Sequence, residues 1–208
     1  MKIALNTGIG LAGCGKGTNA PLLDAAFGKK LYTIGTGELC RAEIAAKTPL
    51  GIKIEPIYNA GGLIDDEDIM TMVIQNMQPT DTNLDGVVRK ISQAREMGKV
   101  VNGFSEEFRL EIQQLIYYYD IPSALARERM LDRKRDGETA AVIEKRLNIA
   151  LKNNDQILEY YYKLGTPILT LDATKDIVGN LINRNERIKK IGGYIAGHGF
   201  GPNAYRIR

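Results

Sequence analysis

The segment from Gly10 to Thr18, which reads G-L-A-G-C-G-K-G-T, constrains the fold of this chain more than any other stretch. It fits the pattern G-x-x-x-x-G-K followed by a hydroxyl residue, in which glycines let backbone N–H groups turn onto phosphate oxygens. Lys16 supplies a mobile positive charge, and Thr18 comes one place later than usual because Gly17 is inserted. A plain glycine-rich turn is the alternative. The apolar run before the segment and the helix-compatible run after it favour a phosphate-binding loop.

Four apolar and β-branched stretches alternate with helical patterns along the chain. They cover residues 3–9, 30–34, 115–121 and 167–171. This alternation is typical of an α/β fold with a mainly parallel sheet, in which ligands gather at the carboxyl ends of the strands. Polar residues Asn6 and Thr7 interrupt the first stretch, which makes its boundaries less regular than those of a central strand.

Helical patterns with recognisable ends fill the segments between the strands. We expect helices over residues 18–26, 37–46, 52–59, 65–77, 88–97, 122–133, 138–164 and 174–190. Gly98 is expected to end the fifth of these helices. Residues 191–208 are rich in glycine and show no periodicity, so we interpret them as a flexible or loosely docked tail.

Composition excludes several classes of protein. A formal net charge of +3, from 28 basic and 25 acidic side chains, is too small by itself to indicate a nucleic-acid partner. The absence of a signal-like segment and of any run of eighteen apolar residues predicts a cytoplasmic protein without a membrane partner. Cys14 and Cys40 have no second cysteine or histidine at ligand spacing, so we expect no zinc and no disulfide.

A set of arginines follows several distinct elements. Its members are Arg41, Arg89, Arg129, Arg133, Arg135 and Arg146. Phosphoryl transfer needs phosphates held in line and their negative charge neutralised, which suits the guanidinium fork. Arg129 and Arg133 share a helix face, while Arg135 and Arg146 converge if the helix that carries Arg146 begins early. The arginines alone leave a solvated basic face open as the alternative.

The order of these motifs resembles that of adenylate kinase and the wider nucleoside monophosphate kinase family, from Gly10 to about Lys175. Residues 13–18 look like the family's loop, in which Gly follows Lys and Thr comes next. Residues 36–41 (T-G-E-L-C-R) are similar to the family's T-G-D-x-x-R, and residues 85–89 (D-G-V-V-R) to its D-G-F-P-R. Residues 60–65 and 172–175 are similar to the segments that pass the acceptor base and the ATP base.

The resemblance implies a role for each matched residue. It implies ATP binding by Gly13, Cys14, Gly15, Lys16, Gly17, Thr18, Arg129, Arg133 and Lys175. It implies binding of the nucleoside monophosphate by Thr36, Arg41, Gly62, Leu63, Ile64, Gly86, Arg89 and Gln93. It implies that transition-state charge is neutralised by Lys16, Arg89, Arg133, Arg135 and Arg146. Asp85 would hold Mg²⁺, which arrives with ATP, through a water molecule.

The resemblance also implies the architecture and the activity. The fold would be that of a P-loop NTPase, with a five-stranded, mainly parallel sheet flanked by helices. A single kinase domain would cover residues 1–190, with a monophosphate-binding lobe over about 35–64, a minimal lid over about 132–138 and the tail over 191–208. The activity would be reversible transfer of the ATP γ-phosphoryl group to AMP by a monomer, since Thr36 and Gln93 match the adenylate form of the pattern.

Departures from the family pattern keep alternatives open. Ala12 and Val88 replace prolines, Val87 replaces a phenylalanine, and Gly137 stands where a second aspartate is expected. A UMP/CMP kinase, or a nucleotide-binding relative with weak or no catalysis, would fit the same motifs. A nucleic-acid binder fits less well, because acidic residues are interleaved with the basic ones and no aromatic stacking platform accompanies them.

Overall fold

Five parallel strands form one central sheet in the computed structural model, which describes residues 1–135 and 137–200. The strands are β1 (Lys2–Gly10), β2 (Tyr32–Gly35), β3 (Thr82–Asp85), β4 (Glu111–Asp120) and β5 (Ile168–Asp172). Their order in the sheet is β2-β3-β1-β4-β5. The predicted α/β fold with a five-stranded sheet is confirmed, and the strand that carries the glycine-rich loop lies at its centre.

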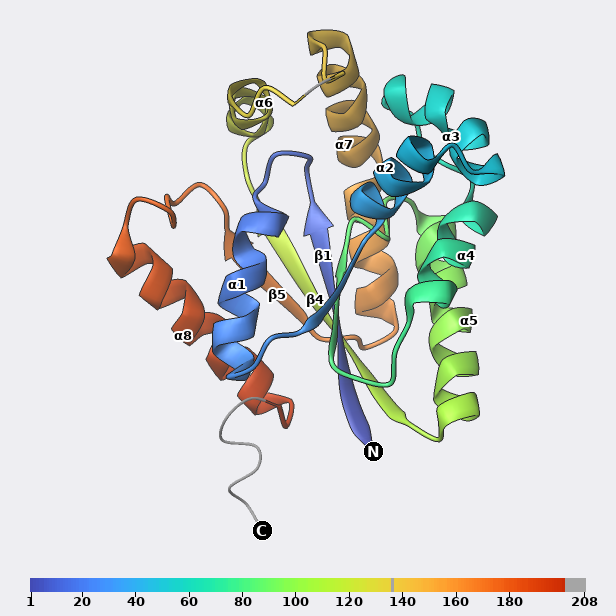
Figure 1. Ribbon diagram of the computed structural model, residues 1–208. Coiled ribbons are helices and arrows are strands. Elements are labelled where there is room, and N and C mark those ends of the chain that lie inside the picture. Colours follow the sequence, from blue (N-terminus) through green and yellow to red (C-terminus); the bar gives the residue numbers. More distant parts are fainter. Residues whose placement is uncertain (136, 201–208) are drawn as a thin grey trace.

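Helices cover both faces of the sheet (Figure 1). They are α1 (Lys16–Phe27), α2 (Thr36–Ala46), α3 (Pro49–Asn59), α4 (Asp66–Asn76), α5 (Ile91–Phe108), α6 (Ser123–Asp132), α7 (Ala140–Lys163) and α8 (Leu181–Gly197). Figure 1 shows α1 and α8 on one face and α4, α5 and α7 on the other, and each face has its own apolar core. None of the helices in the described part of the chain is long and apolar enough to cross a bilayer.

Buried polar side chains explain why β1 looks irregular in the sequence and why β3 lies outside the four apolar stretches from which strands were predicted. Asn6 of β1 accepts a hydrogen bond from the Tyr117 hydroxyl at 3.1 Å and donates to the Thr82 carbonyl at 3.1 Å. Asn6 is fully buried, and Thr82 and Asn83 of β3 are buried as well. Because paired polar groups can be buried at little cost, these strands occupy the centre of the sheet without an apolar run.

Helix α5 extends ten residues beyond Gly98, so the prediction that this glycine ends the helix is wrong. Ala94, Met97 and Val101 lie on one face and are buried against the core beneath α5. Burial of that face outweighs the modest intrinsic cost of one glycine, about 1 kcal/mol. The helix ends instead at Arg109, whose backbone adopts the left-handed conformation with φ of 51°.

Helix α8 covers residues 181–197, so the predicted boundaries of 174 and 190 are wrong at both ends. Asp176 accepts hydrogen bonds from the N–H groups of Val178 and Gly179, which form a turn where the helix was expected to begin. Ile191 and Ile195 are fully buried, and this apolar face carries the helix through the glycines of the expected tail. Phe200, also in the predicted tail, is buried in the core, so the part of the tail that the structure describes is docked. Residues 201–208 of the predicted tail lie outside the described residues.

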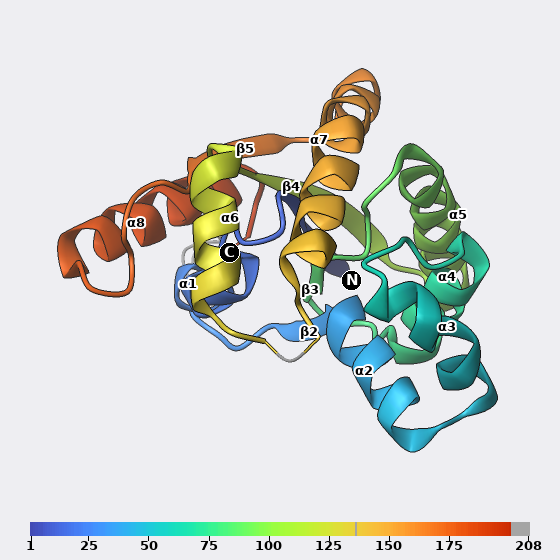
Figure 2. The ribbon, with the colours of Figure 1, turned by 90° about the horizontal axis from the view of Figure 1, so that it is seen from above.

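Helices α2 and α3 form a pair beside the sheet (Figure 2). Thr48 caps α3 by accepting a hydrogen bond from the Gly51 N–H at 2.9 Å. A methyl group on Gly51 would lie 2.0 Å from the Glu43 carbonyl oxygen, so α3 packs directly on the end of α2. The absence of a side chain at Gly51 therefore sets the spacing of this pair.

Replacing Gly51 with alanine is expected to lower the melting temperature. Overpacking of this kind costs about 1–3 kcal/mol, which corresponds to roughly 2–12 °C in a chain of this size. Gly103→Ala is the matched control, because no atom lies within 4 Å of the added methyl group and the helix gains propensity. Thermal unfolding followed by circular dichroism checks both variants. Equal melting temperatures would contradict the close packing of α2 and α3.

Candidate active site

One cleft of about 880 Å³ collects every site residue that the sequence predicted. It opens beside the carboxyl ends of β1, β2, β3 and β5, where the loops of a parallel sheet gather. The predicted residues along its wall are Gly13, Cys14, Gly15, Lys16, Gly17, Thr18, Thr36, Arg41, Gly62, Leu63, Ile64, Asp85, Gly86, Arg89, Gln93, Arg129, Arg133, Arg135, Arg146 and Lys175. The arginines therefore converge, which a solvated basic face would not require.

The glycine-rich loop joins β1 to α1 in a shape that only glycine adopts readily. Gly13 and Gly15 have φ of 84° and 88°, and Gly15 is the N-cap of α1. A methyl group on Gly13 would lie 2.3 Å from the Ala126 carbonyl oxygen, so the loop packs closely against α6. The first N–H groups of α1 face the cleft and favour an anion there.

Lys16 is the first residue of α1 and directly follows Gly15 of this loop. Its ammonium group donates hydrogen bonds to the carbonyl oxygens of Gly10 at 3.0 Å and Leu11 at 3.1 Å. These acceptors hold the positive charge over the loop, where the N–H groups of α1 also point. The loop can therefore surround an oxyanion with backbone donors and one mobile cation.

The turn after β3 is held by hydrogen bonds to a single carbonyl group. The Gly86 carbonyl accepts from the Thr36 hydroxyl at 2.8 Å and from Arg89 Nε at 3.0 Å. Val87 and Val88 are buried in the core beneath the turn. These contacts hold the Arg89 side chain although Val87 and Val88 stand where the family pattern has a phenylalanine and a proline.

Arg89 faces the cleft with a second guanidinium near it. Its pKa is lowered from the ordinary value, first because surrounding protein atoms desolvate it and then because of the positive charge of Arg146. The carboxylate of Asp85 acts in the opposite direction. An arginine keeps its charge in proteins, so the two guanidinium groups create an excess of positive charge that an anion would relieve.

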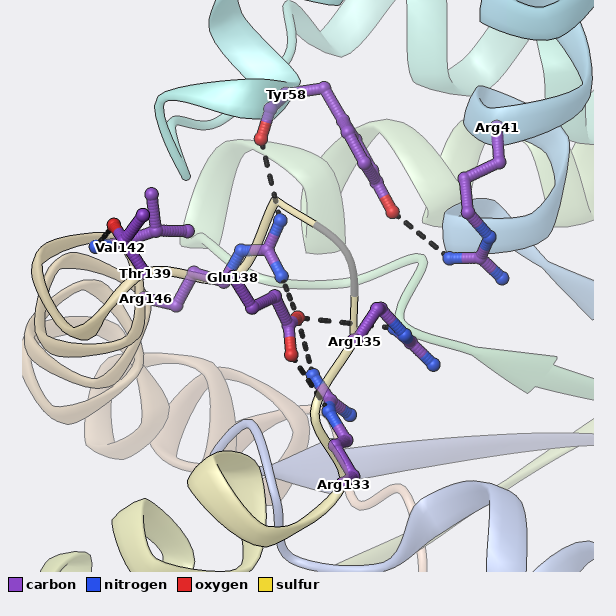
Figure 3. Close-up of polar contacts among 8 residues, drawn as sticks. All are labelled: Arg41, Tyr58, Arg133, Arg135, Glu138, Thr139, Val142 and Arg146. Carbon is purple, nitrogen blue, oxygen red and sulfur yellow. Dashed lines mark hydrogen bonds and ion pairs between the residues drawn. The ribbon is translucent and has the colours of Figure 1, made fainter.

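Glu138 joins three of the predicted arginines (Figure 3). Its carboxylate is 3% exposed, accepts from Arg133 Nε at 2.8 Å and pairs with Arg146. Arg135 Nη1 lies 4.0 Å from the same carboxylate. Helix α7 begins at Ala140, so Arg135 lies outside it, and the condition for its convergence with Arg146 by helical spacing, an early start of this helix, is not met. A shared carboxylate brings them together instead.

Replacing Glu138 with glutamine is expected to lower the melting temperature by several degrees. The change leaves three cations without their shared carboxylate, at a cost of about 2 kcal/mol, below that of a fully buried pair because the arginines are partly exposed. Saturating ATP is expected to narrow the difference from the unmodified protein, because the family resemblance implies that these arginines neutralise the charge of its phosphates. Thermal melts with and without ATP check this expectation.

Glu144→Gln is the matched control for this prediction. Glu144 pairs with Arg127 at the surface, where both side chains are nearly half exposed, so its loss should change the melting temperature very little. A difference for Glu138→Gln that ATP leaves unchanged would show that the arginines do not receive the phosphates.

Tyr58 connects the helix pair α2 and α3 to α7. Its hydroxyl accepts a hydrogen bond from Arg41 Nη1 at 2.9 Å, and the Arg146 guanidinium lies 5.4 Å from the centre of its ring (Figure 3). Arg146 Nη2 also donates to the Tyr58 carbonyl at 3.3 Å. Two arginines from different helices are thus oriented by one tyrosine.

Four residues beside the predicted ones were missed by sequence reasoning. They are Asn19, Tyr58, Glu138 and Arg187. Glu138 lies only three residues after Arg135 and five after Arg133, and this closeness of opposite charges in the sequence is a local signal that could have been used. Asn19, Tyr58 and Arg187 carry no such local signal, because their partners are distant in the sequence.

The loop after β5 forms another part of the cleft wall. Arg129 donates to the carbonyls of Ala173 at 2.7 Å and Thr174 at 3.2 Å. The pKa of the Asp172 carboxyl is lowered, chiefly by the hydrogen bonds that it accepts from the hydroxyl and the backbone N–H of Thr174. The loop is therefore ordered by its own side chains and by α6.

Comparison with known proteins gives a consistent result. The family model for adenylate kinase matches residues 9–166. An adenylate kinase of Prochlorococcus marinus strain MIT 9301 is 33% identical over 171 residues, which cover 81% of this chain and 90% of that protein. Adenylate kinases of Oenococcus oeni and Leuconostoc mesenteroides are 33% and 34% identical over 178 and 175 residues, which cover 81% of this chain and 89% and 88% of those proteins.

Proposed function

Because this chain belongs to the adenylate kinase family, and is thereby a nucleoside monophosphate kinase, we propose that it transfers the γ-phosphoryl group of ATP reversibly to AMP. The products are two molecules of ADP. The glycine-rich loop and the cluster of arginines lie in the same cleft, which supports a reaction between two phosphorylated ligands held side by side.

The observation that carries the choice of AMP is the hydrogen bond of Gln93. Its side-chain oxygen accepts from the Arg89 N–H at 2.9 Å, and the side chain is 2% exposed at the wall of the cleft. Because the side-chain oxygen is engaged in this bond, the NH₂ group of Gln93 remains to donate a hydrogen bond to the acceptor base. Adenine and cytosine present an acceptor at the ring position in question, whereas uracil and guanine present a donor, which an NH₂ group cannot satisfy. The bond therefore favours AMP over UMP and GMP, and the match of Thr36 and Gln93 to the adenylate form of the pattern favours AMP over CMP.

In the proposed reaction, the P–O bond to the γ-phosphorus of ATP breaks as an oxygen of the AMP phosphate attacks from the opposite side. The glycine-rich loop and Lys16 would hold the donor phosphates, and Thr36, Arg41 and Arg89 the acceptor. Arg133, Arg135 and Arg146 would neutralise the charge that spreads over the transferred group. The protein supplies alignment and charge, and no covalent intermediate is needed.

The remaining contacts in this proposal involve both the donor nucleotide and the acceptor nucleotide. The phosphates of ATP would be surrounded by Gly13, Cys14, Gly15, Gly17 and Thr18. The part of ATP beyond these phosphates would be contacted by Arg129 and Lys175. Gly62, Leu63, Ile64 and Gly86 would line the acceptor base. Residues 35–64 would close over the acceptor and residues 132–138 over the donor.

Magnesium enters this proposal together with ATP. Asp85 ends β3 at the cleft and offers a carboxylate, and Thr18 offers a hydroxyl. The described residues contain no group of three or more acidic, histidine or cysteine side chains that could hold a metal alone. This small set of oxygen donors fits Mg²⁺, which keeps several waters and binds phosphates. When bound, the ion would neutralise charge on the phosphates.

A coupled assay of diphosphate formation with AMP, UMP, CMP and GMP as acceptors tests the proposal. AMP is expected to give the highest kcat/KM, and a preference for any other acceptor would overturn it. Gln93→Leu should raise the KM for AMP about 10-fold or more, because a buried donor to the base is lost. Gln156→Leu, at an exposed position of α7, serves as the control and should change nothing.

A further inference from the structure

A buried arginine of α8 lies at the end of the cleft that the proposed donor occupies. Arg187 is 7% exposed, lines the cleft and lies beyond the residues that the family model matches. Its Nη1 donates to the Asn19 side-chain oxygen at 3.0 Å, and its Nη2 donates to the Asp172 carbonyl. One guanidinium group therefore bridges the first turn of α1 and the loop that follows β5.

The α1 end of this bridge is firmly anchored. Asn19 is 1% exposed, and its side-chain nitrogen donates to the Gly15 carbonyl at 2.7 Å. Gly15 is the N-cap of α1, and the next turn of the helix buries Leu22 and Leu23 in the core. Arg187 is thus connected to the glycine-rich loop through a single side chain.

The other end of the bridge is held by hydrogen bonds and by two buried apolar side chains. Three successive carbonyl groups, those of Asp172, Ala173 and Thr174, accept from the guanidinium groups of Arg187 and Arg129. Ala173 and Ile177 are buried in the core, whereas Val178 is 80% exposed. The two arginines, one from α6 and one from α8, therefore fix the backbone of the loop between these apolar contacts.

The charge of Arg187 supports a role toward an anionic ligand. It forms no ion pair with any carboxylate in the described part of the chain, and its two bonds go to neutral oxygens. Burial lowers its pKa. A buried cation with only neutral acceptors is costly, and a polyphosphate in the adjacent cleft would offset that cost.

We propose that Arg187 is a positioning residue for the donor nucleotide. By joining Asn19 to the Asp172 carbonyl, it sets the width of the slot between α1 and the loop after β5, into which the donor base fits. The proposal rests on the proposed function in that the donor is a nucleoside triphosphate. Arg187 acts through the loop rather than on the transferred phosphate.

Equilibrium binding to the full chain tests this inference, with ATP and inorganic tripolyphosphate as probes. Arg187→Lys keeps the charge but cannot span both acceptors, because an ammonium group lacks the planar fork. We expect the Kd for ATP to rise about 10-fold, while the Kd for tripolyphosphate, which has no base, stays within about twofold. In the kinetic assay the KM for ATP should rise while the KM for AMP does not.

Arg184→Lys is the matched control, since Arg184 is exposed on the same helix, and it should change neither constant. An equal rise in Kd for ATP and tripolyphosphate, or no change in either, would overturn the inference. Asn19→Ala, which removes the other end of the bridge, should give the same pattern and add little to Arg187→Lys in the double variant. If one of these two variants fails to fold, the other still tests the inference.

The binding readout also separates this inference from the proposed function. If the unmodified protein binds ATP but does not phosphorylate AMP, the proposed function fails, and the comparison of the two probes still tests Arg187. If it phosphorylates AMP and the two probes respond equally to Arg187→Lys, only the inference about Arg187 fails.

Discussion

Replacing Lys16 with methionine is expected to reduce kcat by about 10²–10³-fold or more. The ammonium group lies over the glycine-rich loop, where it would follow the negative charge that moves during transfer, and loss of one such donor removes about that much of the rate. The KM for AMP should change little, because Lys16 lies on the donor side. Initial rates at saturating ATP and AMP measure the effect.

Two further measurements guard the interpretation of the Lys16 variant. Its ammonium also bonds the carbonyls of Gly10 and Leu11, so a melting curve must show that the fold is intact. Lys30→Met, at an exposed position after α1, should leave kcat unchanged. A Lys16→Met enzyme with nearly full kcat would show that the lysine of this loop does not take part in phosphoryl transfer.

Replacing Arg89 with methionine is expected to lower kcat/KM for AMP by about 10³-fold, within the range measured when a transition-state arginine is removed. Arg89 is fixed by the Gly86 carbonyl and lies near Arg146, where a phosphate would meet two guanidinium groups. Arg89→Lys should recover only part of the loss, because a single ammonium group cannot form the bidentate contact. Steady-state kinetics with varied AMP measure both.

Binding measurements locate the Arg89 effect on the acceptor side. The Kd for ATP should stay within about threefold, since the donor site is formed by other residues. Arg95→Met, at an exposed position of α5, is the matched control and should retain normal kinetics. If Arg89→Met weakened ATP as much as AMP, the division of the cleft into donor and acceptor sides would be wrong.

Much of the fold and of the cleft could be predicted because the relevant signals are local. The glycine-rich loop, the alternation of strands and helices, and the ordered motifs each lie within a few residues of sequence. The ends of two helices were predicted wrongly because tertiary burial outweighs local propensity, at Gly98 of α5 and at Gly192 of α8. In both helices an apolar face continues through the glycine and packs against the core.

The parts of the site that could not be predicted depend on contacts between distant residues. Tyr58 meets Arg41 and Arg146 only because α3 lies beside α2 and α7. Arg187 meets Asn19 across 168 residues of chain, and no motif marks either one. Glu138 was within reach of local reasoning, but its burial among three arginines was not.

The strand order has a consequence for how the chain folds. The strand β1 precedes the other four strands in the sequence and lies at the centre of the sheet, yet its Leu5 pairs with Thr82 and its Gly10 with Tyr119. Such non-local pairing makes the search for the native sheet slower than in a helical bundle, because long loops must close before contacts form. During synthesis, the glycine-rich loop therefore has only its local hydrogen bonds until β4 and α6, more than 90 residues further along the chain, are available to pack against it.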